Sequence, residues 1–162
     1  MPFGGHNNYV QIVQADTFVM LFTEMIHNAR VIEVDGRPHL PSTIRQWSGD
    51  SRGHWDGDTL VVETTNFTSK TPFEGETDAG HRVEPSLGQD RSRRVVERLT
   101  RVSASALRYQ FTVDEPSVFT RPFSGELTMQ RTQARLYEYA CHEGNYAIAD
   151  ILRGARATER ER

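Results

Sequence analysis

Apolar and polar residues alternate along most of this chain, and a period of two is typical of β-strands. Residues 106–113 show the pattern clearly, because Leu107 and Tyr109 fall on one face while Arg108 and Gln110 fall on the other. Comparable patterns predict strands at residues 8–14, 16–27, 29–34, 58–67, 92–102, 106–113, 124–131 and 135–142. Short turns separate several of these runs, so we expect neighbouring runs to pair as antiparallel hairpins.

About eight strands with almost no helical periodicity predict a mainly β protein built on an antiparallel sheet. A chain of 162 residues closes such a sheet most economically as a barrel. We therefore expect a closed or half-open β-barrel, similar to that of lipocalins, in a single domain over residues 1–162.

One helix is predicted near the end of the chain, over about residues 145–156. Ile148, Ile151 and Leu152 recur there at helical spacing, and Asn145 has the side chain of an N-cap. We expect this helix to pack across one mouth of the barrel.

Two long connections interrupt the strand pattern. Residues 35–55 contain Trp47 and Trp55, and we expect this connection to be ordered. Residues 69–91 are acidic and poor in large apolar side chains, and we expect them to form a mobile insertion.

Composition and charge narrow the classes of partner. The net charge is −3, and no basic strip of the kind that binds nucleic acid is present. No apolar run reaches the roughly 18 residues of a membrane-spanning helix, and residues 1–10 lack the pattern of a signal peptide, so the sequence as given predicts a cytoplasmic protein without a membrane segment. Cys141 is the only cysteine, which excludes an internal disulfide.

The segment EYACHEGNYA, at the joint between the last predicted strand and the helix, carries the first candidate site. We expect His142 to act there as a general base, with Glu143 orienting it or acting as an acid, and Asn145 binding substrate. The alternative is that Glu143 or Asn145 caps the helix and that His142 is a hydrogen-bonded residue of the barrel rim.

The segment TEMIHNAR carries the second candidate site. Period two places Glu24 and His27 on opposite faces, which argues against a helical metal pair. Glu24 shares its face with apolar residues, where a carboxylate is either paired or has a raised pKa, and it is, like Glu143, a candidate to orient the base or to act as an acid. His27 is the second candidate base, and Arg30 is expected to pair with a carboxylate or enolate of the substrate.

The long connection over residues 35–55 contributes candidate binding residues. His39, Arg45 and Trp47 suit a lid over an aromatic or carboxylate-bearing ligand, although the same residues also suit a surface loop that its tryptophans hold in place. The remaining candidate substrate-binding residues, from the N-terminal segment and from the barrel wall, are Asn8, Tyr109 and Tyr139.

The motifs TEMIHNAR, DGRPHLP, IRQW and YEYACHEGNY resemble the C-terminal region of a large, mostly uncharacterised family of environmental bacterial proteins. The resemblance covers about residues 7–157, and it departs from the family around residues 76–91 and in lacking an N-terminal region. It implies export as an alternative location, and it implies no particular reaction. The polar positions that it implies are shared are Glu24, His27, Arg30, His39, Arg45, Trp47, His142, Glu143 and Asn145.

These observations favour an enzyme that uses a barrel cavity for cofactor-free acid–base chemistry, a lyase or isomerase acting on a partly apolar, aromatic small molecule. One alternative is a metal-dependent enzyme that holds Zn²⁺ or Mn²⁺ through a carboxylate and three of His27, His39, His54 and His142. The other alternative is a non-catalytic carrier of a hydrophobic molecule. If the barrel is open, its sheet edges favour a homodimer.

Overall fold

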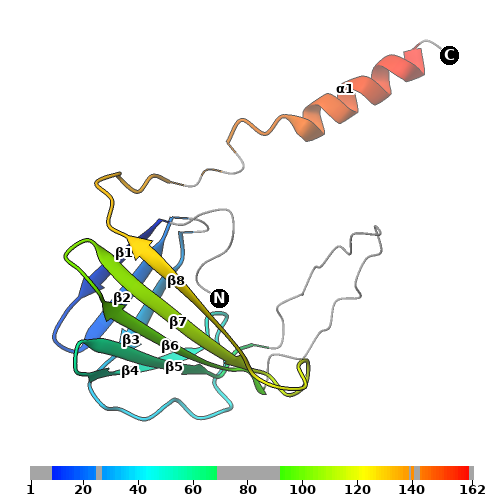
Figure 1. Ribbon diagram of the computed structural model, residues 1–162. Coiled ribbons are helices and arrows are strands. Elements are labelled where there is room, and N and C mark those ends of the chain that lie inside the picture. The colour runs from blue at the N-terminus through cyan, green and yellow to red at the C-terminus, as the bar shows by residue number, and fades with distance from the viewer. Residues whose placement is uncertain (1–8, 25–26, 69–91, 139, 141–142, 161–162) are drawn as a thin grey trace.

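A computed structural model gives the structure of the protein and describes residues 9–24, 27–68, 92–138, 140 and 143–160 (Figure 1). The described residues form eight strands and one helix, namely β1 (Val10–Gln14), β2 (Phe18–Thr23), β3 (Ala29–Glu33), β4 (Asp50–Asp56), β5 (Thr59–Thr65), β6 (Arg94–Arg101), β7 (Ala106–Asp114), β8 (Phe123–Gln130) and α1 (Ala147–Arg160).

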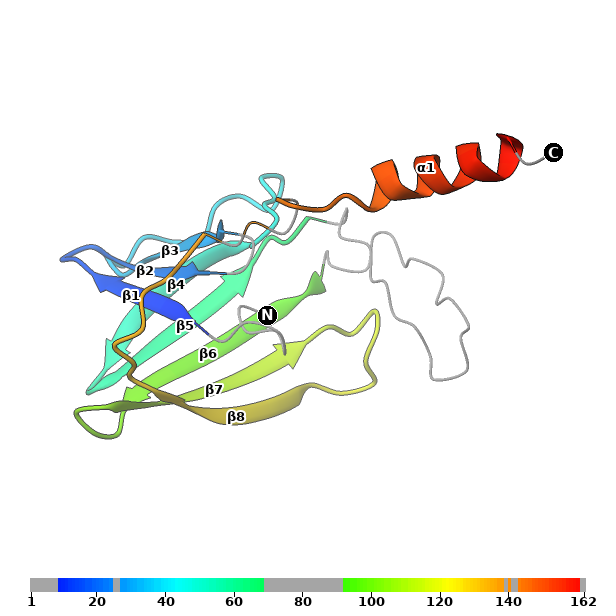
Figure 2. The ribbon, with the colours of Figure 1, turned by 90° about the horizontal axis from the view of Figure 1, so that it is seen from above.

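The eight strands form a single sheet in which their spatial order is their order in the sequence. All described pairs are antiparallel except that of β3 with β4, which is parallel. The sheet curls through 234° into a half-barrel (Figure 2). The predicted mainly β, half-open barrel with a C-terminal helix is therefore confirmed, with the correction that one strand pair is parallel.

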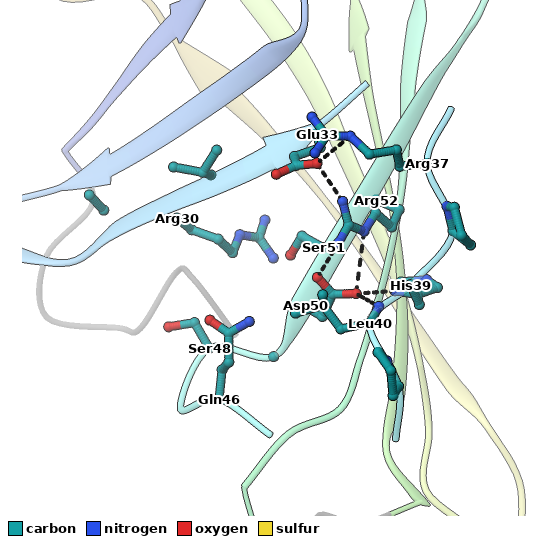
Figure 3. Close-up of a pocket in the computed structure, with 15 residues that line it drawn as sticks. Arg30, Glu33, Arg37, His39, Leu40, Gln46, Ser48, Asp50, Ser51 and Arg52 are labelled. Carbon is teal, nitrogen blue, oxygen red and sulfur yellow. Dashed lines mark hydrogen bonds and ion pairs between the residues drawn. The ribbon is translucent and has the colours of Figure 1, made fainter. Parts of the chain in front are cut away.

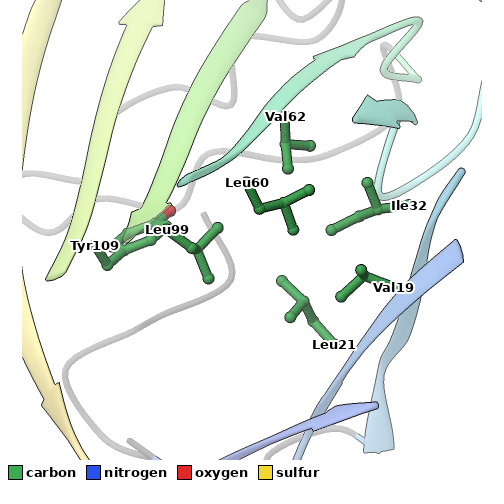
Figure 4. Close-up of a cluster of buried hydrophobic side chains, with 7 residues drawn as sticks. All are labelled: Val19, Leu21, Ile32, Leu60, Val62, Leu99 and Tyr109. Atoms are coloured by element: carbon green, nitrogen blue, oxygen red, sulfur yellow. The ribbon is translucent and has the colours of Figure 1, made fainter. Parts of the chain in front are cut away.

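The core lies on the concave face of the half-barrel (Figure 4). Alternate residues of β2, β5 and β6 point inward, as period two requires, and the cross-strand register brings their apolar side chains together. The buried cluster consists of Val19, Leu21, Ile32, Leu60, Val62, Leu99 and Tyr109. Gly53 of β4 completes this layer without a side chain, because a Cβ there would lie 2.8 Å from Cγ2 of Ile32.

Strand β4 lies within the connection that the sequence predicted over residues 35–55, so that prediction was wrong at its C-terminal end. The inward positions of β4 begin with Ser51 and Gly53, which give no apolar alternation. Pairing with β5 over all seven residues from Asp50 to Asp56 makes this segment a strand. Tertiary pairing thus overrides a weak local preference.

The predicted strand over residues 135–142 is also wrong in its described part, because residues 135–138 and 140 are irregular. Residues 139, 141 and 142 lie outside the described residues. As a consequence, β8 has no strand partner on its outer side among the described residues, and the half-barrel stays open between β8 and β1.

Helix α1 projects from the half-barrel instead of covering its mouth (Figure 1). None of its described residues is buried, so the predicted packing was wrong. The helix also continues past Gly154, whose cost in a helix interior is only about 1 kcal/mol. No helix within the described ranges is long and apolar enough to cross a membrane.

Candidate functional site

Three polar side chains, one from β3 and two from the neighbouring strands β6 and β7, meet inside the half-barrel. Nη1 and Nη2 of Arg30 in β3 donate to the two carboxylate oxygens of Glu97 in β6, at 2.6 and 3.0 Å. The hydroxyl of Tyr109 in β7 donates to the same carboxylate at 2.7 Å. Glu97 is completely buried, so these three bonds replace the water that its charge would otherwise bind.

The alternation of β6 explains why this carboxylate points inward. Val95 and Leu99 are buried core residues, and Glu97 lies between them on the same face. Burial, together with the adjacent negative charge of Glu97, raises the pKa of Tyr109. The phenol therefore stays protonated and serves as the donor in its hydrogen bond to Glu97. The carboxylate of Glu97 thus holds Arg30 and Tyr109 and links β3 to β6 and β7, while Nε of Arg30 is buried without a hydrogen-bond partner among the described residues.

A polar pocket lies between β3, β4 and the connection that joins them (Figure 3). Within the described residues β3 and β4 share a single pair, Glu33 with Arg52, so the two strands separate on either side of it. The separation leaves a cavity of about 540 Å³. The side chains of Arg30, His39 and Asp50 are among those that line it.

A network of charged groups holds this pocket together. Oδ2 of the buried Asp50 accepts hydrogen bonds from Nδ1 of His39 at 2.8 Å and from the main-chain N–H of Leu40 at 2.9 Å. Arg52 donates to Asp50 at 2.9 Å and to Glu33 at 2.6 Å (Figure 3). Burial opposes the ionisation of Asp50, but the bonds from Leu40, His39 and Arg52 outweigh it and lower its pKa.

The second nitrogen of His39 faces another carboxylate, with Nε2 lying 3.8 Å from Oε1 of Glu63. The ion pair with Arg94 lowers the pKa of Glu63, with His39 contributing in the same direction, so both carboxylates around His39 stay ionised near neutral pH. A histidine held this way orients the connection against β4 and β5. The network therefore fixes the connection that the sequence predicted to be ordered.

A larger groove of about 1650 Å³ lies along the open side of the half-barrel. It is lined by the start of β1, the end of β8, the β6–β7 turn and residues 131–136, which cross the open side after β8 (Figure 2). Its aliphatic lining includes Val10, Ile12, Leu107, Leu127, Met129 and Leu136.

The candidate Glu24 lies at this groove. It follows β2 directly, and its Oε1 accepts the main-chain N–H of Tyr137 at 2.9 Å, which ties the crossing segment to the end of β2. His27 lies three residues further on, in the turn between β2 and β3, with a left-handed φ of 53° and an exposed side chain. His27 lines neither pocket, so the structure does not bring these two candidates together at a site.

The other predicted residues are dispersed. Arg30 and Tyr109 meet in the core cluster, and His39 lies in the polar pocket, whereas Arg45 donates to the main-chain oxygen of Phe67 at 3.0 Å and holds the connection in place. The residues of the predicted set that are exposed and line neither pocket are Trp47, Glu143 and Asn145. Those that lie outside the described residues are Asn8, Tyr139 and His142.

Asn145 takes the second of the two roles that the sequence predicted for it, that of a helix cap. Its Oδ1 accepts the main-chain N–H of Ala147, the first residue of α1, at 3.1 Å. The helix thus begins two residues later than the predicted boundary, and Asn145 lies where it can satisfy a free N–H of the first turn.

The sequence analysis did not single out three residues that lie at the sites described above. Glu97 lies in the buried cluster with Arg30 and Tyr109, and Arg101 and Arg131 line the groove. The strand alternation that identified Glu24 could have identified all three. Glu97 and Arg101 continue the inward row of β6, and Arg131 continues the inward row of β8. A charged residue on an otherwise apolar strand face was the pattern to follow.

Comparison with protein families finds no matching family model, and comparisons with curated proteins and with solved structures find no significant match. Among the described residues, no group of three or more His, Cys, Asp and Glu side chains is arranged to hold a metal ion. The metal-dependent alternative stays a prediction, because His142, one of its expected ligands, lies outside the described residues.

Proposed function

We propose that the protein binds a small, largely apolar molecule in the groove along the open side of the half-barrel. The observation that carries this proposal is the groove itself, a concave surface of about 1650 Å³ whose lining combines aliphatic side chains with a similar number of polar ones. Binding sites for small molecules are concave and combine apolar walls with polar groups that fix the ligand's orientation, and this space exceeds the roughly 300–1000 Å³ of a typical ligand pocket.

The apolar lining supplies the driving force. Ile12 of β1 and Leu127 of β8 keep 37% and 39% of their surface exposed, although both lie on the concave face of the sheet. Covering apolar surface gains roughly 25 cal/mol per Å², so a ligand that covers both residues is favoured over water. The buried core behind them, with Leu21 and Tyr109, gives the groove a rigid base.

Proton transfer is the chemistry that this groove would support if the protein is an enzyme. Glu24 is the carboxylate among the described residues that line it. A carboxylate at the edge of an apolar site is a reasonable acid or base for a lyase or isomerase reaction. We therefore retain Glu24 as the candidate catalytic residue at the groove. Ligand binding is the first proposal, and catalysis by Glu24 is the second.

Fluorescence of the neutral dye Nile red tests the binding proposal directly. We expect saturable binding to the purified protein, and we expect Leu127→Gln to weaken it by about tenfold, since roughly 1.4 kcal/mol of apolar contact is lost. Ser124→Gln is the matched control, because Ser124 lies in the same strand, is exposed on the opposite side of the sheet and does not line the groove. Dye binding that is absent, or that both variants weaken equally, would contradict the proposal.

A further inference from the structure

We propose that the ligand of this groove is an aliphatic carboxylate, and that Arg101 and Arg131 bind its carboxylate group. This inference rests on the proposed function and adds the chemical class of the ligand. It starts from the position of the two arginines on the concave face.

The strand register places these arginines together at one end of the groove. Arg101 ends β6 and pairs with Leu107 of β7, and Leu107 pairs in turn with Met129 of β8. Arg131 follows two residues after Met129 and so continues the same face. Both arginines line the groove.

Hydrogen bonds hold both residues beside the β6–β7 turn. The main-chain N–H of Arg131 donates to the oxygen of Ser105 at 2.7 Å. Nε of Arg101 donates to the main-chain oxygen of Ser103 at 3.2 Å, in the same turn. The guanidinium of Arg101 is thus anchored through one nitrogen, while its two terminal nitrogens make no hydrogen bond to a described residue.

The arginines of the groove differ from those of the sheet and connections in their charge partners. Seven of the fifteen described arginines form ion pairs with carboxylates, namely Arg30, Arg37, Arg52, Arg93, Arg94, Arg98 and Arg153. By contrast, Arg101, Arg131 and the neighbouring Arg135 form no ion pair with any residue that the structure describes. All three line the groove, whose described lining contains one carboxylate, that of Glu24.

An arginine pair beside an aliphatic surface selects an amphipathic anion. The planar guanidinium matches a carboxylate through two parallel, charge-assisted hydrogen bonds. Tyr9 is the one aromatic residue in the described lining, which otherwise consists of aliphatic and polar side chains. A flexible acyl chain therefore fits this lining better than a flat aromatic ring does.

Displacement of Nile red by decanoate and by decan-1-ol tests the inference, because the two compounds share a chain and differ in the charged group. We expect decanoate to bind the wild-type protein about tenfold more tightly than decan-1-ol, as hydrogen bonds to a charged group contribute roughly 1.5–3 kcal/mol. We expect the double variant Arg101→Gln/Arg131→Gln to abolish this preference and to keep its affinity for decan-1-ol.

The double variant Arg108→Gln/Arg121→Gln is the matched control. It removes the same charge from exposed positions that do not line the groove, and we expect it to keep the preference for decanoate. Equal affinity of the wild-type protein for both compounds would overturn the inference while leaving apolar binding in place. Equal loss of the preference in both double variants would overturn it as well, because net charge rather than contact would then be responsible. If neither compound displaces the dye, the proposed function fails together with the inference.

Discussion

Arg30 and Glu97 are 67 residues apart in the sequence and meet inside the half-barrel as an ion pair with two hydrogen bonds, of 2.6 and 3.0 Å. The side chain of Arg30 is 11% exposed, and that of Glu97 is fully buried. Arg30 also lines the polar pocket between β3 and β4. The pair thus connects the region where the sheet separates to the opposite wall of the core.

Glu97→Gln is expected to destabilise the protein severely. The substitution keeps the shape of the side chain but leaves the buried charge of Arg30 without its counter-charge, which typically costs about 3–5 kcal/mol. The measurement is the free energy of unfolding in urea. Arg98→Gln is the control, since it breaks the exposed pair of Arg98 with Asp56, and exposed pairs contribute only about 0–1 kcal/mol.

Replacing both partners is expected to recover part of that loss. In Arg30→Met/Glu97→Leu no charge is left buried, and apolar side chains of similar size occupy the space. The double variant should therefore be more stable than the sum of the two single substitutions predicts, in a double-mutant cycle. Additive losses would show that the two side chains act independently, contrary to the geometry.

Tyr109→Phe is expected to cost about 1.5–3 kcal/mol at neutral pH, because Glu97 loses a hydrogen bond to a charged group. Tyr137→Phe is the control, since that side chain is 71% exposed. We expect little change in its free energy of unfolding.

The same tyrosine is expected to produce a loss of stability at alkaline pH. Burial raises the pKa of Tyr109 in the folded protein, so above about pH 10 the unfolded chain loses a proton that the folded protein keeps. The free energy of unfolding therefore falls as the pH rises beyond that point. Unfolding curves between pH 8 and about pH 11 should show a smaller fall for Tyr109→Phe than for the wild-type protein. An identical fall would contradict this account.

Asp50 is expected to contribute stability that disappears in acid. Its pKa in the folded protein is lowered, so the contribution is complete above its ordinary pKa of about 3.9 and is lost as the pH falls through the lower folded value. Asp50→Asn should reduce stability at neutral pH and flatten the loss below about pH 4. Unfolding curves at successive pH values provide the measurement, with Asp58→Asn in the exposed β4–β5 turn as the control. If the free energy of unfolding falls with decreasing pH in the same way in Asp50→Asn as in the wild-type protein, Asp50 does not have this role.

Removal of the chain after Tyr146 is expected to leave the half-barrel intact. None of the described residues of α1 is buried, so its loss removes no core contact. We expect the free energy of unfolding to change by less than about 0.5 kcal/mol, as for exposed substitutions. A large fall in the melting temperature would show that α1 packs against the half-barrel in solution.

The strands that the sequence predicted well are those with one solvent-exposed face and one buried face. In β7, Tyr109 and Val113 are buried while Arg108, the residue before Tyr109, is exposed, and the alternation is visible without any structure. β4 could not be found in this way, because Ser51 and Gly53 occupy its inward positions. Its strand conformation comes from the backbone bonds to β5, which the composition of β4 does not encode.

The candidate site was harder to predict than the fold. Glu24 was recognised as an unusual carboxylate and does line the groove, whereas Glu97 follows the same pattern in β6 and was passed over. His27 was a candidate by residue type, but a left-handed turn places it away from both pockets. Residue type alone suggested chemistry, and strand register decided which side chains could meet.

The sequence by itself determined the class of this protein, seven of its eight described strands and the existence of a C-terminal helix, because period two and period 3.6 are local properties of the chain. The tertiary structure alone decided that the barrel stays open, that Arg30 reaches Glu97, and that Arg101 and Arg131 share one end of a groove. These relationships depend on register between strands far apart in the chain. The free energy of such pairing comes from packing and hydrogen bonds that no short segment contains.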